Sequence, residues 1–315
     1  MSKLRAAVVG VGYFGSRHVD KWAALEDVEL AYVVDRDAEL ARKVARRTGA
    51  AVAVDPAQLA GKVDVASVAV PTEHHCAVAS TLLDAGIHLL VEKPLTRTLE
   101  EADRLVATAE ARGLELRGGH LERFNPALVA VRERIVRPRF MECHRLAPFK
   151  PRSTDVDVVL DLMIHDIDII LSLVGAEVAE VRASGVPVLT GSVDIANARI
   201  EFADGCVANV TASRVSAKSM RKLRVFQPDT YVSIDFEARE CAVARKLPGE
   251  TRDGMPKIDH ELRRFAQGDS LEAELRAFVD AVRGRARPGA TGREGRRALD
   301  LALAVSHRIR DGLGR

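Results

Sequence analysis

A lysine that directly follows a short apolar run is the first residue whose position suggests chemistry. The run His88–Val91 has the composition of a buried strand, and it leads without a spacer into Glu92-Lys93-Pro94. In an open parallel α/β sheet, ligands bind beyond the carboxyl ends of the strands. A lysine at such an end can stabilise negative charge on a substrate oxygen. The alternative, a solvated surface lysine, fits poorly after four residues of buried character.

A carboxylate and an imidazole four positions apart form a second candidate group. Asp161 and His165 fall within a predicted helix, in which residues i and i+4 lie on the same face. Asp161 would then orient the ring of His165 and stabilise its cation, as a general base near neutral pH requires. The alternative is an exposed i,i+4 ion pair, but the surrounding apolar residues favour burial. Asp166 and Asp168 are weaker candidates that could cap the helix or pair structurally.

A glycine-rich turn near the N-terminus predicts that the chain binds a dinucleotide. Residues 10–15 have the pattern Gly-x-Gly-x-x-Gly between a predicted strand and a predicted helix. Gly10 would allow the tight turn, Gly12 the close approach of a pyrophosphate, and Gly15 the close packing of the helix. Asp35 lies 20 residues beyond Gly15, where an acid is expected to bind ribose hydroxyls. The alternative is a glycine-rich turn in a domain that binds no nucleotide.

The predicted cofactor is NAD rather than NADP. The carboxylate of Asp35 would repel a 2′-phosphate, although the adjacent Arg36 could accept NADP or stack on adenine. No metal is predicted, because His74 and His75 have no Cys, Asp or Glu partner at ligand spacing, and a role at a helix start is preferred. Besides these residues, the predicted cofactor-binding set contains Tyr13, Phe14, Pro71, Thr72, His75, Glu92, Lys93 and Pro94.

The first third of the chain alternates short apolar runs with longer helical patterns, which is typical of a doubly wound parallel sheet. The predicted strands are Ala6–Val9, Val28–Val34, Ala51–Val54, Val65–Val70, His88–Val91 and Leu114–Arg117. The predicted helices are Phe14–Ala24, Ala38–Thr48, His75–Ala85 and Leu99–Arg112. The sequence therefore predicts an α/β Rossmann domain over residues 1–119, with Pro71 and Thr72 lining the same crevice as the glycine turn.

After residue 119 the pattern changes to consecutive strands joined by short turns, which predicts an antiparallel sheet in an α+β domain over residues 120–315. The predicted strands are Phe140–Leu146, Ala179–Ser184, Ile195–Phe202, Cys206–Ser213, Leu223–Gln227 and Thr230–Phe236. The predicted helices are Pro126–Ile135, Val158–Leu173, Leu271–Arg283 and Arg293–Asp311. The last two helices could pack back on the first domain.

The composition limits the classes of function. A length of 315 residues suggests two domains, at about 100–200 residues each. A net charge of +2 and an aromatic content of 4% give no support to nucleic-acid binding. No window approaches the roughly 18 apolar residues of a membrane span, and the short run after the N-terminus reads as a strand rather than a signal peptide. The four cysteines are scattered, so a reduced, cytoplasmic protein is expected.

Taken together, the motifs resemble those of the Gfo/Idh/MocA oxidoreductases. The motifs are Gly10-x-Gly12-x-x-Gly15, Pro71-Thr72-x-x-His75, Glu92-Lys93-Pro94, Arg123-Phe124-x-Pro126 and Asp161-x-x-x-His165. The resemblance implies a Rossmann domain, and a second domain whose large open antiparallel sheet mediates homodimers or homotetramers. It also implies NAD(P)-dependent chemistry on sugars or polyols, with Lys93, Asp161 and His165 as the catalytic group.

A narrower resemblance, to UDP-N-acetylglucosamine 3-dehydrogenases, is carried by residues 119–126 and 158–168. It implies that the C3 hydroxyl of the sugar is oxidised to a ketone, which a pyridoxal-phosphate aminotransferase then converts for lipid A or surface-glycan synthesis. The predicted substrate ligands are His165 and basic residues that suit a diphosphate, namely Arg123, Lys150, Arg152, Arg214 and Lys218. Each basic residue could instead be a solvated surface charge.

The sequence is also compatible with other functions. The chain could be a dehydrogenase of another nucleotide sugar, of a sugar acid or of a free polyol such as an inositol. It could also be an NAD-dependent glycosidase, or a non-catalytic NAD-binding sensor. The presence of Lys93 and His165 argues against the sensor, because a sensor needs neither residue.

Overall fold

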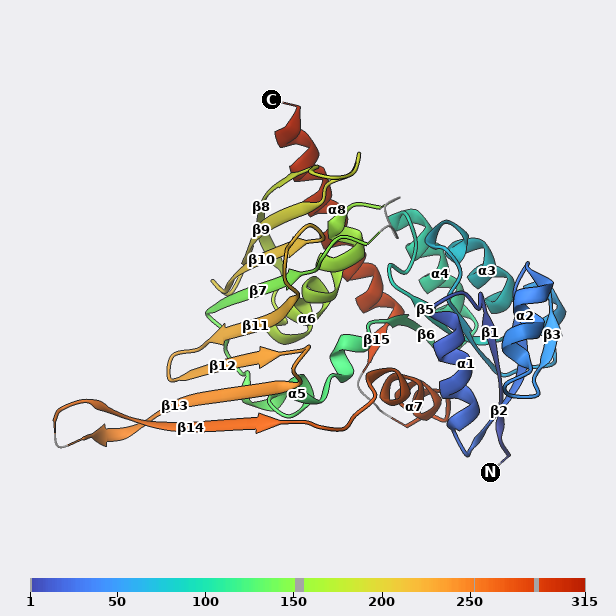
Figure 1. The fold of residues 1–315 in the computed structure, drawn as a ribbon, viewed down its shortest axis with the longest axis horizontal. Helices are drawn as coiled ribbons and strands as arrows, with labels where there is room; N and C mark the ends of the chain where they lie inside the picture. The colour runs from blue at the N-terminus through green and yellow to red at the C-terminus, as the bar shows by residue number, and fades with distance from the viewer. Residues whose placement is uncertain (1, 151–155, 252, 286–288, 315) are drawn as a thin grey trace. The chain divides into compact units, whose positions relative to one another are not determined.

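The computed structural model describes residues 2–150, 156–251, 253–285 and 289–314. By their internal contacts these residues form two units, whose helices and strands are labelled in Figure 1. The first unit runs up to Leu121 and also contains Asp269–Leu299. The second unit contains Glu122–Gly268 and the residues from Asp300 onward. Each unit is built around one β-sheet.

The sheet of the first unit has the strand order β15-β6-β5-β4-β1-β2-β3. Its strands are β1 (Leu4–Val9), β2 (Val28–Val34), β3 (Ala51–Ala53), β4 (Val65–Val68), β5 (His88–Glu92), β6 (Leu116–Gly119) and β15 (Ala290–Thr291). Neighbouring strands are parallel, apart from the antiparallel pair of β15 with β6. The chain order reverses between β1 and β4, which is where ligands bind in doubly wound sheets.

Helices complete the first unit, and its core is made mainly of small aliphatic residues. The helices are α1 (Gly15–Ala24), α2 (Ala38–Ala45), α3 (Thr72–Asp84), α4 (Leu99–Ala111), α7 (Ser270–Val282) and the start of α8 (Gly292–Leu313), with a 3-10 turn at Pro56–Leu59. All four residues of β4 are buried, as expected for a strand covered on both faces. The rings of Trp22 in α1 and Phe278 in α7 meet edge to face, with 6.3 Å between centroids. A late segment of the chain therefore belongs to this core.

The sheet of the second unit has the strand order β14-β13-β12-β11-β7-β10-β9-β8. Its strands are β7 (Phe140–Leu146), β8 (Val178–Val186), β9 (Ile195–Phe202), β10 (Val207–Ser213), β11 (Met220–Phe226), β12 (Thr230–Asp235), β13 (Glu240–Glu250) and β14 (Pro256–Arg264). Only β7 and β10 run parallel among these described pairs. The two strand orders confirm the predicted fold class, a Rossmann domain with an α+β domain built on a mainly antiparallel sheet.

One face of the second sheet is buried and the other is open. The helical segments of this unit include α5 (Pro126–Val129), a turn at Arg132–Arg134, a π-helical turn at Val159–Met163 and α6 (Ile164–Val174). In Figure 1, α6 lies against one face, and no helix among the described residues of this unit lies on the opposite face. Burial alternates accordingly along β7, where Met141, Cys143 and Arg145 point inward and are buried. The rings of Phe140, Phe226 and Tyr231 cluster on the open face.

The structure departs from the sequence prediction at the short strand β15, which was not predicted, and at several other points. Strands β13 and β14 were not predicted, because β14 and the second half of β13 are mostly exposed, and only Cys241 and Val243 at the start of β13 are buried. The predicted helix Pro126–Ile135 is wrong beyond Val129, where the chain forms separate short turns. The predicted helix from Val158 begins with a π-helical turn rather than a regular α-helix. Within the described residues, no helix has the length and apolar character needed to cross a bilayer.

Candidate active site

The glycine turn that follows β1 is shaped by steric constraints at two of its glycines. Gly10 has a φ of +83°, and a Cβ there would lie 2.7 Å from atoms of Val70. A Cβ on Gly15 would lie 1.8 Å from the carbonyl oxygen of Gly10, so the start of α1 can approach the turn only through a glycine. A Cβ on Gly12 would meet no atom within 4 Å. The position of Gly12 is thus open to an approaching ligand, and the turn fits a pyrophosphate at the N-terminus of α1.

The acid at the end of β2 is fixed against this turn. One carboxylate oxygen of Asp35 accepts a hydrogen bond from the main-chain nitrogen of Val11 at 2.9 Å. The other accepts from the main-chain nitrogen of Asp37 at 3.0 Å. Asp35 is half-buried, whereas its neighbour Arg36 is exposed. The carboxylate therefore has a defined position beside the glycine turn, which fits the recognition of ribose hydroxyls.

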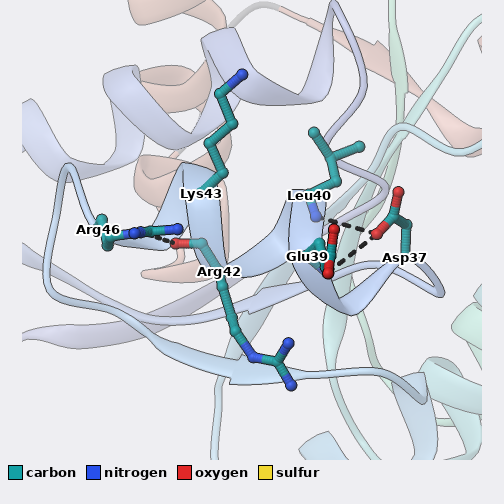
Figure 2. Close-up of a pocket in the computed structure, with 6 residues that line it drawn as sticks. All are labelled: Asp37, Glu39, Leu40, Arg42, Lys43 and Arg46. Carbon is teal, nitrogen blue, oxygen red and sulfur yellow. Dashed lines mark hydrogen bonds between the residues drawn. The ribbon is translucent and has the colours of Figure 1, made fainter.

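A hollow along α2 is lined by residues that follow this acid in the sequence, and Figure 2 shows them. The carboxylate of Asp37 accepts hydrogen bonds from the main-chain nitrogens of Glu39 and Leu40 and so caps α2. The hollow has a volume of about 560 Å³ and is lined by Asp37, Glu39, Leu40, Arg42, Lys43 and Arg46. Five of these six residues are charged, so the hollow lacks the apolar walls of a typical ligand pocket.

At the end of β4, two residues predicted to line the crevice lead into α3. Pro71 is exposed and Thr72, the first residue of α3, is half-buried. His75 is buried in the first turn of α3, and its ring nitrogens lie 2.9 Å from the carbonyl oxygens of Pro94 and Val70. Burial lowers the pKa of His75, and hydrogen bonds to these carbonyls oppose that shift. The ring therefore links the end of β4 to the turn that contains Lys93.

The lysine turn follows β5 directly. Lys93 is half-buried between the buried residues Glu92 and Pro94, and the Lys93–Pro94 peptide bond is cis. The carboxylate of Glu92 turns inward, where Oε1 lies 2.9 Å from Nε2 of His18. Glu92 and His75 thus contact groups of the protein itself, and their predicted contact with the cofactor stays a prediction. Among the described residues, no cluster of side chains could hold a metal ion.

In the second unit, the predicted base lies where the helix changes its type. Asp161 is part of the π-helical turn, and His165 is the second residue of α6. Both side chains are half-buried, whereas the residues around them are mostly buried. A π-helical turn contains an extra residue compared with an α-helix, and such turns are frequent at functional sites. The two candidate residues are therefore separated by a change in helical pitch, not placed on one regular helix as the sequence predicted.

Buried ion pairs hold the helix that carries His165. Asp166 accepts two hydrogen bonds from Arg145 of β7, both of 2.9 Å, and Arg145 also donates to Glu122 at 2.9 Å. Asp168 accepts two hydrogen bonds of 2.7 Å from Arg123. Burial raises the pKa of Asp166, and the charge of Arg145 limits that rise. Asp166 and Asp168 therefore pair structurally, one of the two roles that the sequence allowed.

The predicted substrate ligands lie in different environments. Arg123 and Arg214 are buried, Arg123 in the pair just described and Arg214 with Nε 2.9 Å from Oδ1 of Asp194. Lys150 and Lys218 are exposed. Arg152 lies outside the described residues. Both arginines are paired with buried carboxylates, so the two exposed lysines are better placed to bind an anion from solvent.

Sequence reasoning missed several residues that position the candidate groups. Arg145 occupies an inward position of β7, and an arginine at a position that alternation assigns to the core is a signal that could have been used. His18, Ser67 and Trp22 are completely buried polar residues of the first unit. They lie on α1 and β4, far from Glu92 in the sequence, and nothing in their spacing predicts that they meet it.

Comparisons with known proteins agree with this architecture. Residues 4–120 match the oxidoreductase family with an NAD-binding Rossmann fold, and residues 132–230 match the Gfo/Idh/MocA C-terminal domain. The chain is 42% identical to the UDP-N-acetylglucosamine 3-dehydrogenase of Acidithiobacillus ferrooxidans, over 97% of each chain. A solved structure of UDP-N-acetylglucosamine 3-dehydrogenase from that organism has a TM-score of 0.90 and 39% identity over 98% of both chains.

A more distant structure shares the fold. The scyllo-inositol dehydrogenase of Lactobacillus casei, solved with NAD(H) and scyllo-inositol, matches with a TM-score of 0.81 and 18% identity. The match covers 99% of this chain and 98% of that one. The glycine turn, the acid after β2 and these similarities define an oxidoreductase with an NAD-binding Rossmann domain. The chain belongs to the Gfo/Idh/MocA family.

Proposed function

We propose that this protein is an NAD-dependent dehydrogenase that oxidises the C3 hydroxyl of UDP-N-acetylglucosamine. The observation that carries the proposal is the 42% identity, over 97% of the chain, to a relative named for this reaction. The product would be the 3-keto nucleotide sugar. Its ketone would suit a later transamination by a pyridoxal-phosphate aminotransferase, on the way to lipid A or a surface glycan.

The first unit would hold the cofactor, and bound NAD would supply the hydride acceptor. Gly10, Gly12 and Gly15 fit the pyrophosphate, because the turn is open at Gly12 and tightly packed at the other two. Asp35 would bind the ribose hydroxyls, and its carboxylate disfavours the 2′-phosphate of NADP. The exposed Arg36 is the feature that could favour NADP. The remaining proposed cofactor contacts are Tyr13, Phe14, Pro71, Thr72, His75, Glu92, Lys93 and Pro94.

Three side chains would carry the proton chemistry. His165 would take the proton of the substrate hydroxyl, with Asp161 orienting its ring and stabilising its cation. Lys93 would stabilise the oxygen as negative charge develops on it. A general base of this kind typically contributes about 10²–10⁴-fold to the rate. Replacing Lys93 or His165 by Ala should therefore abolish measurable turnover while NAD still binds, which equilibrium titration of the variants with NAD would check.

The diphosphate of the substrate calls for cationic partners. The proposed set is Arg123, Lys150, Arg152, Arg214 and Lys218. Among the described residues of this set, Lys150 and Lys218 have the strongest support, because their ammonium groups are exposed whereas both arginines take part in buried ion pairs. Single replacement of Lys150 or Lys218 by Met should raise KM for the nucleotide sugar more than it lowers kcat.

The proposal extends to assembly and location. The open face of the second sheet carries Phe140, Phe226 and Tyr231 in ring contact, with centroids 5.8 and 5.1 Å apart. These rings are half-buried, and apolar side chains gathered on an uncovered sheet face favour association, so we propose a homodimer or homotetramer formed through this face. A cytoplasmic location fits a nucleotide-sugar substrate and four buried, unpaired cysteines. The aminotransferase would be a partner in function and need not bind.

The direct test is oxidation of UDP-N-acetylglucosamine by the purified protein with NAD. Alcohol oxidation near neutral pH is unfavourable, so a carbonyl trap or an aminotransferase should draw off the ketone. We expect growth of the reduced-nicotinamide absorbance with NAD, less with NADP, and a 3-keto product by mass spectrometry. Turnover of N-acetylglucosamine without the uridine diphosphate should be far slower.

The same substrate panel separates the other functions. Faster turnover of an inositol or of a nucleotide sugar acid would overturn the assigned substrate and leave the dehydrogenase activity standing. Release of free sugar without net cofactor reduction would indicate a glycosidase. Binding of NAD with no turnover of any member of the panel would indicate a sensor.

A further inference from the structure

Four polar side chains form a chain of hydrogen bonds inside the first unit and end beside Lys93. Nε1 of Trp22 lies 2.8 Å from Oγ of Ser67, and Oγ lies 3.0 Å from Nδ1 of His18. The opposite ring nitrogen of His18, Nε2, lies 2.9 Å from Oε1 of Glu92. Trp22, Ser67 and His18 are completely buried. Polar groups at such depth are costly unless they are paired, so this arrangement fixes each partner.

The direction of each hydrogen bond follows from the groups at the two ends of the chain. The indole Nε1–H of Trp22 can only donate, so Oγ of Ser67 accepts from it. At the other end the ionised carboxylate of Glu92 can only accept, so Nε2 of His18 donates to it. In the neutral form of the ring Nδ1 is then an acceptor, and the hydroxyl of Ser67 donates its hydrogen to it. The tautomer of His18 is thus set by Glu92 and matched by Ser67.

The carboxylate of Glu92 has little freedom to move away from His18. A Cβ added to Gly119 would lie 2.7 Å from Oε1 and 2.9 Å from Cδ of Glu92, so the carboxylate fills the space that a larger residue in β6 would occupy. Glu92 is bonded directly to Lys93, and on the other side of the lysine the ring of His75 contacts the carbonyl of Pro94. Both neighbours of Lys93 are therefore held by buried histidines.

We propose that His18 is a positioning residue, which fixes Glu92 through a charge-assisted hydrogen bond and thereby sets the position of the Lys93 amine. The inference rests on the proposed function, because it assigns His18 a role in the reaction through Lys93. A hydrogen bond to a carboxylate is stronger than one between neutral groups. A misplacement of a reacting group by about 1 Å can cost about 10²-fold in rate. A change at His18 is therefore expected to reach the chemistry without contact to substrate.

Two isosteric replacements of His18 separate positioning from simple stability. In His18→Gln the side-chain amide reaches the place of Nε2 and can still donate to Glu92. In His18→Asn the amide ends near the place of Nδ1, so it can meet Ser67 but not Glu92. We expect His18→Asn to lower kcat by about 10²-fold, with little change in KM for NAD, and His18→Gln to keep kcat near the wild-type value. The exposed His307 provides the matched control, and neither replacement there should change kcat.

Thermal unfolding is measured on the same variants, because both His18 replacements alter the same buried site. Equal loss of kcat in the Gln and Asn variants, in step with their loss of stability, would overturn the positioning role. Unchanged kcat in both variants would overturn it as well. A difference in kcat between two variants of similar stability would support it.

A second measurement does not depend on turnover. Nitrogen-15 NMR of the imidazole rings should show His18 protonated on Nε2 and not on Nδ1, and the same tautomer should persist in Ser67→Ala, where Glu92 still accepts from Nε2. Trace labelling with acetic anhydride should then give a different rate for the Lys93 amine in His18→Asn and a wild-type rate in His18→Gln. If no sugar in the panel is oxidised but these results hold, the proposed function fails and the positioning of Lys93 stands. The Nδ1-protonated tautomer, or equal labelling in all variants, contradicts the positioning itself.

Discussion

The lysine turn of the first unit and the histidine helix of the second are held in place by different kinds of interaction. At the lysine turn, His18 bonds to the carboxylate of Glu92, and Ser67 bonds to both His18 and Trp22. His75 contacts the main-chain carbonyl of Pro94. Around His165 the partners are arginines and carboxylates in two buried ion pairs. The first arrangement fixes the side chain of one residue. The second fixes a whole helix against a strand and a turn.

The difference matters because the two arrangements respond differently to damage. Removing one partner of a buried ion pair leaves the other charge unpaired at low dielectric, which costs far more than the pair contributes when intact. Removing a neutral member of the hydrogen-bond chain leaves each of its neighbours short of one partner, at about 1–3 kcal/mol for an unsatisfied buried group. Variants in the second unit should therefore lose stability first, and variants around Lys93 should lose activity first.

The largest effect is expected from Arg145→Met, which leaves Asp166 and Glu122 without their shared partner. The free energy of unfolding should fall by about 3–5 kcal/mol, as for other broken buried pairs. Urea denaturation followed by circular dichroism would measure the loss. The exposed Arg182, which pairs with Glu180, is the matched control, and Arg182→Met should change stability little. Replacing Arg145, Asp166 and Glu122 together by apolar residues should recover much of the loss. A loss of stability well below this range in Arg145→Met would contradict the expectation that variants in the second unit lose stability first.

Gly119→Ala should have the next largest effect, because the added Cβ would lie 2.7 Å from Oε1 of Glu92 and the carboxylate must shift. Overpacking of this kind costs about 1–3 kcal/mol, and the displaced Glu92 should also lower kcat. Gly191→Ala is the control, because a Cβ there meets no atom within 4 Å. Thermal unfolding and steady-state rates of the two variants would measure both effects. Wild-type kcat in Gly119→Ala would show that the carboxylate can move without consequence.

Ser67→Ala should have a smaller effect on stability. The change leaves Nε1 of Trp22 without its acceptor and removes the donor to Nδ1 of His18. An unsatisfied buried donor costs about 1–3 kcal/mol. The bond from Nε2 of His18 to Glu92 can still form, so kcat should fall less than in His18→Asn. A larger loss of kcat in Ser67→Ala than in His18→Asn would contradict this prediction.

The smallest effects are expected in the pH dependence of stability, to which two buried carboxylates of the second unit contribute with opposite pKa shifts. Burial alone would raise the pKa of Asp194, but hydrogen bonds from Thr190 and from the main-chain nitrogens of Val188, Leu189 and Thr190 lower it well below its usual range. A lowered folded-state pKa contributes stability above the ordinary value of about 3.9 and loses it as the pH falls below that value. The stability difference between the wild type and Asp194→Asn should therefore shrink under acid conditions.

Asp166 should show the opposite sign, because burial raises its pKa. The folded state then binds a proton more readily than the unfolded chain, so the contribution of this carboxyl falls as the pH rises from about 3.9 towards the raised value. The free energy of unfolding of the wild type should therefore rise relative to that of Asp166→Asn as the pH falls through that window. Each slope is limited to about 1.4 kcal/mol per pH unit for one proton. Urea titrations at several pH values would measure both, and slopes of the same sign would contradict the assignment.

Much of the fold follows from apolar pattern alone. The bounds predicted for the strands Val28–Val34, Phe140–Leu146 and Ile195–Phe202 agree with the structure. They could be predicted because Val28–Val34 is apolar apart from Glu29, and the other two alternate between a buried and an open face. Strand β14 and the second half of β13 could not, because main-chain pairing with a neighbour holds them, and pairing leaves no mark on side-chain composition.

Within the candidate site, the sequence predicted those residues whose role follows from their position directly after one strand. The glycines, the acid after β2 and the lysine after β5 each occupy a position defined by the strand next to it. The hydrogen bond between His18 and Glu92 joins residues 74 positions apart, and that between Trp22 and Ser67 joins residues 45 apart. Contacts of this kind arise from the packing of helix on sheet, and no local pattern encodes them. The same holds for Arg123 and Asp168, whose pairing gives the arginine a structural partner.

The π-helical turn Val159–Met163 makes the spacing before α6 sensitive to chain length. A regular helix advances about 100° per residue, so deleting one residue from this turn would let the segment close into an α-helix. Asp161 would then rotate around the helix axis, whereas Asp166 and Asp168, further along, would keep their arginines. A single deletion would in this way change the angle between Asp161 and His165 around the helix axis and leave the scaffold standing.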